Sequence, residues 1–93
     1  MISLFQKTPN EINKLIAQNI VNLRKRKKIS QKELSKKSGV SYASIRRFES
    51  EGEISLTSLT KIAIALDVSN ELEALFTEVP FDSIEEIING QSK

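Results

Sequence analysis

The stretch "SQKELSKKSGVSYASIRR", residues 30–47, decides how this chain folds. Ser30 and Glu33 have the spacing of a capping box, in which each side chain bonds the other residue's backbone N–H and marks a helix start. Gly39 is placed to end that helix, because glycine readily takes the left-handed conformation found just past a helix. Ser41 can cap a second helix. The stretch therefore predicts two short helices joined by a tight turn, a helix-turn-helix.

Apolar residues in and just after this stretch have the spacing needed to hold the two helices at a fixed angle. These residues are Leu34, Val40, Ile45 and Phe48. The second helix, expected over about residues 42–50, then presents polar and basic side chains outward. A helix of this kind fits the major groove of DNA, where donors and acceptors distinguish all four base pairs.

Helical periodicity extends the all-α prediction to both sides of the turn. Thr8 and Glu11 mark the start of a helix that runs to about Lys27, and Ser55 and Ser69 begin two more. We expect each helix to bury one apolar stripe. In the first helix the stripe is Ile12, Leu15, Ile16, Ile20 and Leu23, and in the last two it is Leu59, Ile62, Ala63, Leu66, Leu72, Leu75 and Phe76.

A sixth, short helix is predicted near the C-terminus. Asp82 and Glu85 repeat the capping-box spacing, and one helical face carries Ile84, Ile87 and Ile88. A helix this short is not stable alone, so we expect it to pack on its own domain, on a second subunit or on another protein. The predicted division of the chain is an N-terminal arm (1–10), a compact five-helix domain (11–77) and a C-terminal helix or tail for dimerisation or partner binding (78–93).

Composition excludes several classes of protein. The 93 residues suffice for one domain, and only three Gly and two Pro favour a helical fold. The absence of His and Cys removes the commonest general base, the thiol nucleophile and the usual zinc ligands. We therefore expect no enzyme activity, no cofactor and no metal. No apolar run approaches the ~20 residues of a membrane span and no signal peptide is evident, so we expect a cytoplasmic protein without a membrane partner.

Charge is segregated along the chain. Residues 1–47 hold twelve Lys and Arg against two Glu, a balance of +10, whereas residues 48–93 hold two Lys against ten Asp and Glu, a balance of −8. This asymmetry suggests a basic face for a polyanion and a separate acidic region, although two ordinary solvated faces would give the same totals.

The stretch "NIVNLRKRKKISQKELSKKSGVSYASIRRFESEGEISLTSLTKIAIALDV" (residues 19–68) resembles the Cro-type, lambda-repressor-like helix-turn-helix family. The likeness extends over about residues 12–76. It implies a lambda-repressor-like DNA-binding domain that reads an operator in double-stranded DNA. Such a domain without appended domains most often acts as a transcriptional repressor or autoregulator, as a homodimer.

The resemblance also implies roles for individual residues. Base edges would be read from the start of the second motif helix by Tyr42, Ala43, Ser44 and Arg46. The DNA backbone would be contacted by Gln31, Ser41, Arg47, Lys32 and Lys28. Arg24 and Glu49 match two positions that form a structural salt bridge in the family, which removes Arg24 from the candidate base readers.

The sequence departs from the family at two places. The segment "ESEGEIS" after the second motif helix, where much of the family has lysine or arginine, carries Glu49, Glu51 and Glu53. Phosphate contacts there would have to come from backbone amides, Ser55 or Thr57, or be absent. Tyr42 replaces the glutamine often found at its position, so base preference cannot be transferred there.

A second interpretation makes the chain an antitoxin. "FQK" (residues 5–7) and "FE……SLTSLTKI" (residues 48–62) resemble the DNA-binding antitoxins encoded with HipA-type kinase toxins. Such a protein would bind a toxin as well as its own operator, with the acidic half and the sixth helix as the docking surface. A third interpretation is a DNA-indifferent adaptor or RNA-associated coactivator of the same fold, which would bind a protein tightly and show no preference among duplexes.

Overall fold

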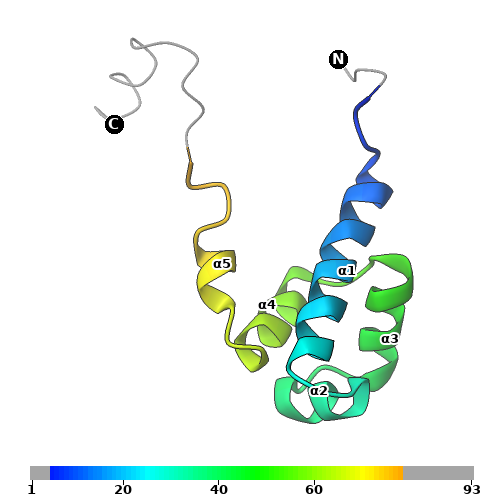
Figure 1. Ribbon diagram of the computed structural model, residues 1–93, viewed down its shortest axis with the longest axis vertical. Coiled ribbons are helices and arrows are strands. Elements are labelled where there is room, and N and C mark those ends of the chain that lie inside the picture. The colour runs from blue at the N-terminus through cyan, green and yellow to red at the C-terminus, as the bar shows by residue number, and fades with distance from the viewer. Residues whose placement is uncertain (1–4, 79–93) are drawn as a thin grey trace.

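The fold is a bundle of short α-helices. The computed structural model describes residues 5–78, and every regular element within them is helical. In chain order the helices are α1 (Pro9–Arg26), α2 (Gln31–Ser38), α3 (Tyr42–Glu51), α4 (Leu56–Ala65) and α5 (Ser69–Glu73). Figure 1 shows α2 at the base of the body, with α3 on one side of α1 and with α4 and α5 on the other. The all-α, five-helix prediction is confirmed, whereas the predicted sixth helix lies outside the described residues.

Side-chain caps fix where the first four helices begin. Each cap accepts a hydrogen bond from the backbone N–H three residues later, and the four caps are Thr8, Ser30, Ser41 and Ser55. At Thr8 and Ser30 the bond is reciprocal, because Glu11 and Glu33 accept from the cap's own N–H. These backbone hydrogen bonds lower the pKa of Glu11 and Glu33 below the ordinary value. The predicted helix starts at these four positions are therefore confirmed.

The core lies where α1 to α4 meet. It contains the four apolar residues predicted to hold the motif helices together, and α4 contributes Ile62 and Leu66. The whole cluster is Ala17, Ile29, Leu34, Val40, Ile45, Phe48, Ile62 and Leu66. Because Ile45 and Phe48 point into this core, the opposite face of α3 is left to solvent.

The prediction that the first half of the apolar stripe on α1 is buried is wrong. Ile12, Leu15 and Ile16 are 40%, 48% and 42% exposed. The N-terminal half of α1 projects beyond the other helices in Figure 1, so no described helix covers this stripe. The second half of the stripe is predicted correctly, because Ile20 and Leu23 are partly buried against the core beside the fully buried Ala17.

The prediction that Leu75 and Phe76 lie on the inner face of the fifth helix is also wrong. Helix α5 ends at Glu73, so Leu75 and Phe76 follow it in turns, where they are 50% and 92% exposed. Phe76 has a φ of +63°, a conformation that cannot continue a right-handed helix.

Two glycines reverse the chain after the motif helices. Gly39 ends α2 with a φ of +78°, and Gly52 ends α3 with a φ of +77°. The surroundings of Gly39 are open, whereas a Cβ on Gly52 would lie 3.0 Å from the carbonyl carbon of Asn13 and from the amide nitrogen of Lys14. The backbone after α3 therefore packs directly on α1, and this contact helps to fix the position of α3.

The two glycines should respond differently to alanine. We expect Gly39→Ala to cost about 1–2 kcal/mol of unfolding free energy, the cost of a left-handed residue with a Cβ. Gly52→Ala should lose a further ~1–3 kcal/mol, because its methyl group meets the α1 backbone. Urea unfolding measures both variants. Equal losses would show that α3 and α1 separate easily at this point.

Candidate nucleic-acid interface

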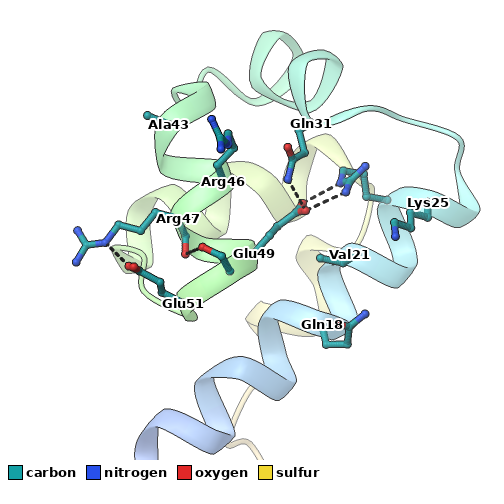
Figure 2. Close-up of a pocket in the computed structure, with 11 residues that line it drawn as sticks. Gln18, Val21, Lys25, Gln31, Ala43, Arg46, Arg47, Glu49 and Glu51 are labelled. Atoms are coloured by element: carbon teal, nitrogen blue, oxygen red, sulfur yellow. Dashed lines mark hydrogen bonds and ion pairs between the residues drawn. The ribbon is translucent and has the colours of Figure 1, made fainter.

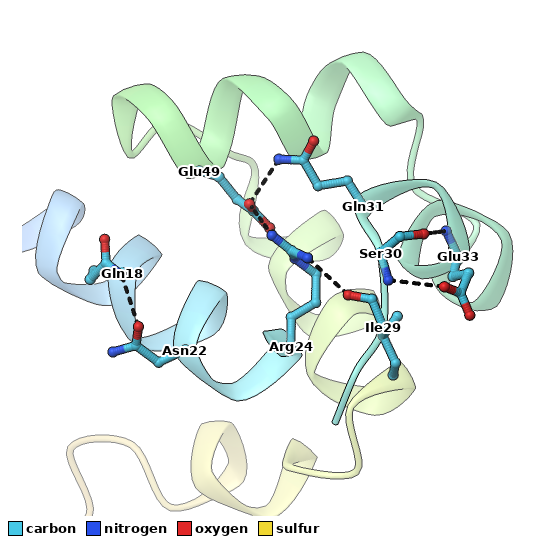
Figure 3. Close-up of polar contacts among 8 residues, drawn as sticks. All are labelled: Gln18, Asn22, Arg24, Ile29, Ser30, Gln31, Glu33 and Glu49. Atoms are coloured by element: carbon cyan, nitrogen blue, oxygen red, sulfur yellow. Dashed lines mark hydrogen bonds and ion pairs between the residues drawn. The ribbon is translucent and has the colours of Figure 1, made fainter. Parts of the chain in front are cut away.

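A buried ion pair joins the ends of three helices. Arg24 on α1 donates from Nε to Glu49 Oε2 on α3 at 2.8 Å and from Nη2 to Glu49 Oε1 at 2.9 Å. Its third nitrogen, Nη1, donates to the carbonyl oxygen of Ile29 at 2.8 Å. Gln31, the first residue of α2, donates from Nε2 to Glu49 Oε1 at 2.8 Å. Figure 3 shows the side chains of Arg24 and Gln31 both hydrogen-bonded to the Glu49 carboxylate.

Hydrogen bonding compensates for the burial of these charges. The side chains of Arg24 and Glu49 are 9% and 7% exposed. Within residues 5–78, no buried side-chain nitrogen or oxygen is left without a hydrogen-bond partner. A buried ion pair with this geometry contributes little net stability compared with an apolar pair, but it fixes the positions of the elements that carry it. Here it sets the α2–α3 pair against α1.

The start of α3 presents a polar and basic surface. Tyr42, Ala43 and Arg46 are exposed, while Ile45 between them is fully buried. Two cations flank the Tyr42 ring, with Arg46 Cζ 5.6 Å and Lys32 Nζ 5.7 Å from its centroid. Both distances lie within the range of cation–π attraction, which restrains the two cationic side chains next to the ring. This cluster joins α2 to α3, and no sequence pattern predicts it.

The two serines at this end of α3 are bonded to one another. The Ser41 hydroxyl accepts from the Ser44 backbone N–H at 3.1 Å and donates to Ser44 Oγ at 2.8 Å. The hydroxyl proton of Ser44 remains free to donate elsewhere, because its oxygen accepts the bond from Ser41. Ser41 therefore has a structural role as a cap, and Ser44 keeps a donor at the exposed surface.

An open depression of about 810 Å³ runs between α1, the start of α2 and the outer face of α3 (Figure 2). It brings together four candidate residues, Gln31, Ala43, Arg46 and Arg47, above the buried ion pair. Lys25 and Gln18 on α1 line it as well, and neither was among the predicted site residues. Lys25 lay within a basic run, but the sequence did not indicate which member of the run faces this depression.

Two predicted backbone contacts, Lys28 and Arg47, lie in different surroundings. Lys28 is exposed between α1 and α2 with a φ of +59°. Arg47 donates from Nε to Glu51 Oε2 at 2.9 Å and from Nη2 to the carboxylate of Glu53. The hydrogen bond with Glu51, followed by the charges of Glu53 and Glu51, raises the pKa of Arg47 further above its ordinary value. The spacing of Arg47 and Glu51, four residues apart on one helix, could have predicted the first of these pairs.

Other kinds of site are not evident in the described part of the chain. Residues 5–78 contain no group of three or more His, Cys, Asp or Glu side chains placed to hold a metal ion. None of the helices in the same range has the length and apolar composition needed to cross a membrane.

Comparison with known proteins gives one match. A family model described as "Helix-turn-helix" matches residues 20–69, which include the second half of α1 and all of α2, α3 and α4. No curated protein and no solved structure matches the chain.

Breaking the buried ion pair should destabilise the fold strongly. Arg24→Met leaves Glu49 buried without its cation, and we expect a loss of about 3–5 kcal/mol in the free energy of unfolding. The double variant Arg24→Met/Glu49→Met should lose less than either single variant, because no unpaired charge remains. The control is Arg47→Met, which removes exposed ion pairs and should change the free energy of unfolding much less than Arg24→Met does.

Urea unfolding at neutral pH measures all four variants. Losses that simply add in the double variant would contradict the assigned coupling between Arg24 and Glu49.

Proposed function

Because this chain belongs to the helix-turn-helix family, we propose that it reads an operator in double-stranded DNA by placing α3 in the major groove. Family membership makes the chain a DNA-binding regulator, and the family's domain is not an enzyme. The observation that carries the more specific proposal is the division of α3 into two faces. Ile45 and Phe48 are buried, while Tyr42, Ala43 and Arg46 face outward on a rigid helix.

Base recognition is assigned to four residues, Tyr42, Ala43, Ser44 and Arg46. The Arg46 guanidinium matches the O6 and N7 acceptors of guanine, and the Ala43 methyl group suits the thymine methyl. The Ser44 hydroxyl has a free donor for a base edge. Tyr42 has a second role beside any base contact, because its ring lies next to Arg46 and Lys32.

Backbone contacts are assigned to side chains around this surface, which would fix register without reading sequence. Gln31 uses one amide N–H on Glu49, and the second N–H of that amide is available for a phosphate. Lys28 and Lys32 are exposed cations at the starts of the α1–α2 loop and of α2. Ser41 and Arg47 complete the set, although Arg47 must exchange its carboxylate partners for a phosphate.

The proposed regulator is a cytoplasmic homodimer that represses transcription by occluding a promoter, including that of its own gene. Two recognition helices related by a two-fold axis would meet half-sites about 34 Å apart on one face of the duplex. The exposed stripe of Ile12, Leu15 and Ile16 supports a protein–protein contact, because an apolar face that no described element covers is typical of an interface.

The alternative proposal is that the acidic half of the chain, residues 48–93, binds a HipA-type kinase toxin, so that the chain is an antitoxin as well as an operator binder. The sequence resemblance at residues 5–7 and 48–62 supports this proposal. A neighbouring reading frame for a kinase-like toxin would favour it over a simple autoregulator.

Arg46→Ala should weaken operator binding selectively. A base-reading arginine is worth about 1–3 kcal/mol on the correct site, and we expect that loss on DNA from upstream of the chain's own gene. Fluorescence anisotropy measures the affinity for this duplex and for a scrambled one across a salt series. Lys61→Ala on α4 is the control, because it removes an equal charge from another helix. Equal losses for the two variants on the upstream duplex would contradict α3 as the reader.

Leu15→Ser should weaken self-association if the α1 stripe is the dimer contact. Burial of a leucine is worth about 1.5–3 kcal/mol, so the dimer dissociation constant should rise at least ~10-fold. Sedimentation equilibrium measures it, with Leu56→Ser as a control in which another exposed leucine is changed. A wild-type chain that stays monomeric across the concentration range would contradict the homodimer and favour the toxin partner.

A further inference from the structure

Arg46 and Arg47 are adjacent on α3 but have different electrostatic surroundings. Arg47 donates to Glu51 at 2.9 Å and also to Glu53, so two carboxylates hold its guanidinium. Within residues 5–78, no salt bridge involves Arg46, which lies against the Tyr42 ring. Figure 2 shows the two side chains leaving α3 in different directions, with Arg47 directed to Glu51. One of the two arginines is therefore largely neutralised in the free protein.

Local structure explains why two carboxylates reach Arg47. Glu51 lies one helical turn after Arg47 in the last turn of α3, where side chains four residues apart are neighbours. Gly52 then takes its left-handed conformation and turns the chain, so that Glu53 lies beside the same guanidinium. Glu51 at the end of α3 and Glu53 just after Gly52 therefore form an acidic cluster beside the outer face of α3.

The three side chains contribute little to folding. Arg47, Glu51 and Glu53 are 63%, 59% and 58% exposed, and ion pairs this exposed add little to stability because water screens their attraction. The same exposure leaves Arg47 able to exchange partners, because solvent and ions reach it freely. Stabilisation of the fold therefore does not explain why two acidic residues lie at this place. A role in the adjacent candidate nucleic-acid interface would explain it.

We propose that Glu51 and Glu53 set the affinity of this interface by competing with DNA phosphate for Arg47. The inference rests on the proposed DNA-binding function. A phosphate contact by a free arginine releases condensed counterions, and each such contact adds about 0.9 to the slope of log affinity against log salt. With Nε and Nη2 held by carboxylates, Arg47 adds less of this term, and two acidic side chains would lie near any phosphate that it contacts.

The consequence is a separation of roles along α3. Phosphate contacts carry no sequence information, so the carboxylate pair changes the affinity for every duplex by a similar factor. Sequence discrimination stays with the start of the helix, where Arg46 has no salt-bridge partner among residues 5–78. Glu51 and Glu53 are therefore affinity-setting residues, and they limit non-specific retention on DNA.

The test uses Glu51→Gln/Glu53→Gln in the full chain and a fluorescein-labelled duplex of scrambled sequence, so it needs no knowledge of the operator. At ~50 mM salt we expect the affinity to rise about three- to tenfold and the salt slope to steepen by about 0.9, the contribution of one phosphate contact. On DNA from upstream of the gene the affinity should rise by the same factor. Circular dichroism and thermal unfolding establish that each variant is folded.

Two further variants identify the cause of any gain. Adding Arg47→Met to the double variant should return affinity to within about twofold of wild type and restore its salt slope, because no phosphate contact remains there. Glu71→Gln/Glu73→Gln removes the same charge from α5, on the other side of α1 from α3 in Figure 1, and should have a smaller effect.

The outcomes separate this inference from the proposed function. An unchanged affinity in Glu51→Gln/Glu53→Gln, or a gain that survives Arg47→Met, overturns the competition while leaving DNA binding intact. A wild-type chain that binds neither duplex at low salt overturns the proposed function and this inference together.

Discussion

Arg24 and Glu49 place a guanidinium and a carboxylate out of water at the meeting point of α1, α2 and α3. Neither charge is tolerable there without the other, so the three helix ends are restricted to arrangements that keep the two groups in contact. Apolar packing alone would allow α3 to slide or rotate by small amounts, because hydrophobic contacts are not directional. The bidentate geometry removes that freedom. The outward face of α3, which carries the proposed DNA-reading residues, is positioned as a result.

A second set of guanidinium and carboxylate groups, near the end of α3, has a different role from the buried pair. Arg47 with Glu51 and Glu53 has the chemistry of Arg24 with Glu49, but each of its members is more than half exposed. Water screens the attraction at that site, so the pair neither restricts the fold nor holds its partners permanently. Burial thus divides the ion pairs of the described residues into two kinds. The buried pair of Arg24 and Glu49 fixes geometry, whereas the exposed pairs of Arg47 can exchange partners. The exchangeable pair lies where a polyanion would approach.

Helix α1 shows how one helix can serve two surfaces. Its C-terminal half contributes Ala17, Val21 and Arg24 to the body of the domain, while its N-terminal half carries Ile12, Leu15 and Ile16 into solvent. The apolar stripe predicted from the sequence divides in the same way, because Ile20 and Leu23 pack against the core while its first three residues are exposed. The inner part stabilises the monomer, and the outer part is available to another surface, which connects the fold of the DNA-binding domain to its proposed dimerisation.

The sequence by itself determined the helix starts, the turn at Gly39, the apolar residues of the motif and the helix-turn-helix class, because capping, glycine conformation and helical periodicity act within a few residues. It also indicated Arg24 and Glu49 as partners, but through family resemblance rather than through any local rule. Only the tertiary structure decided which apolar residues of α1 are covered, that α5 ends before Leu75, and that Tyr42 lies between Lys32 and Arg46. Only the tertiary structure also showed that Glu53 reaches Arg47 and that Gln31 bonds Glu49. These features depend on how whole helices approach one another, and side-chain spacing along the chain carries no information about that approach.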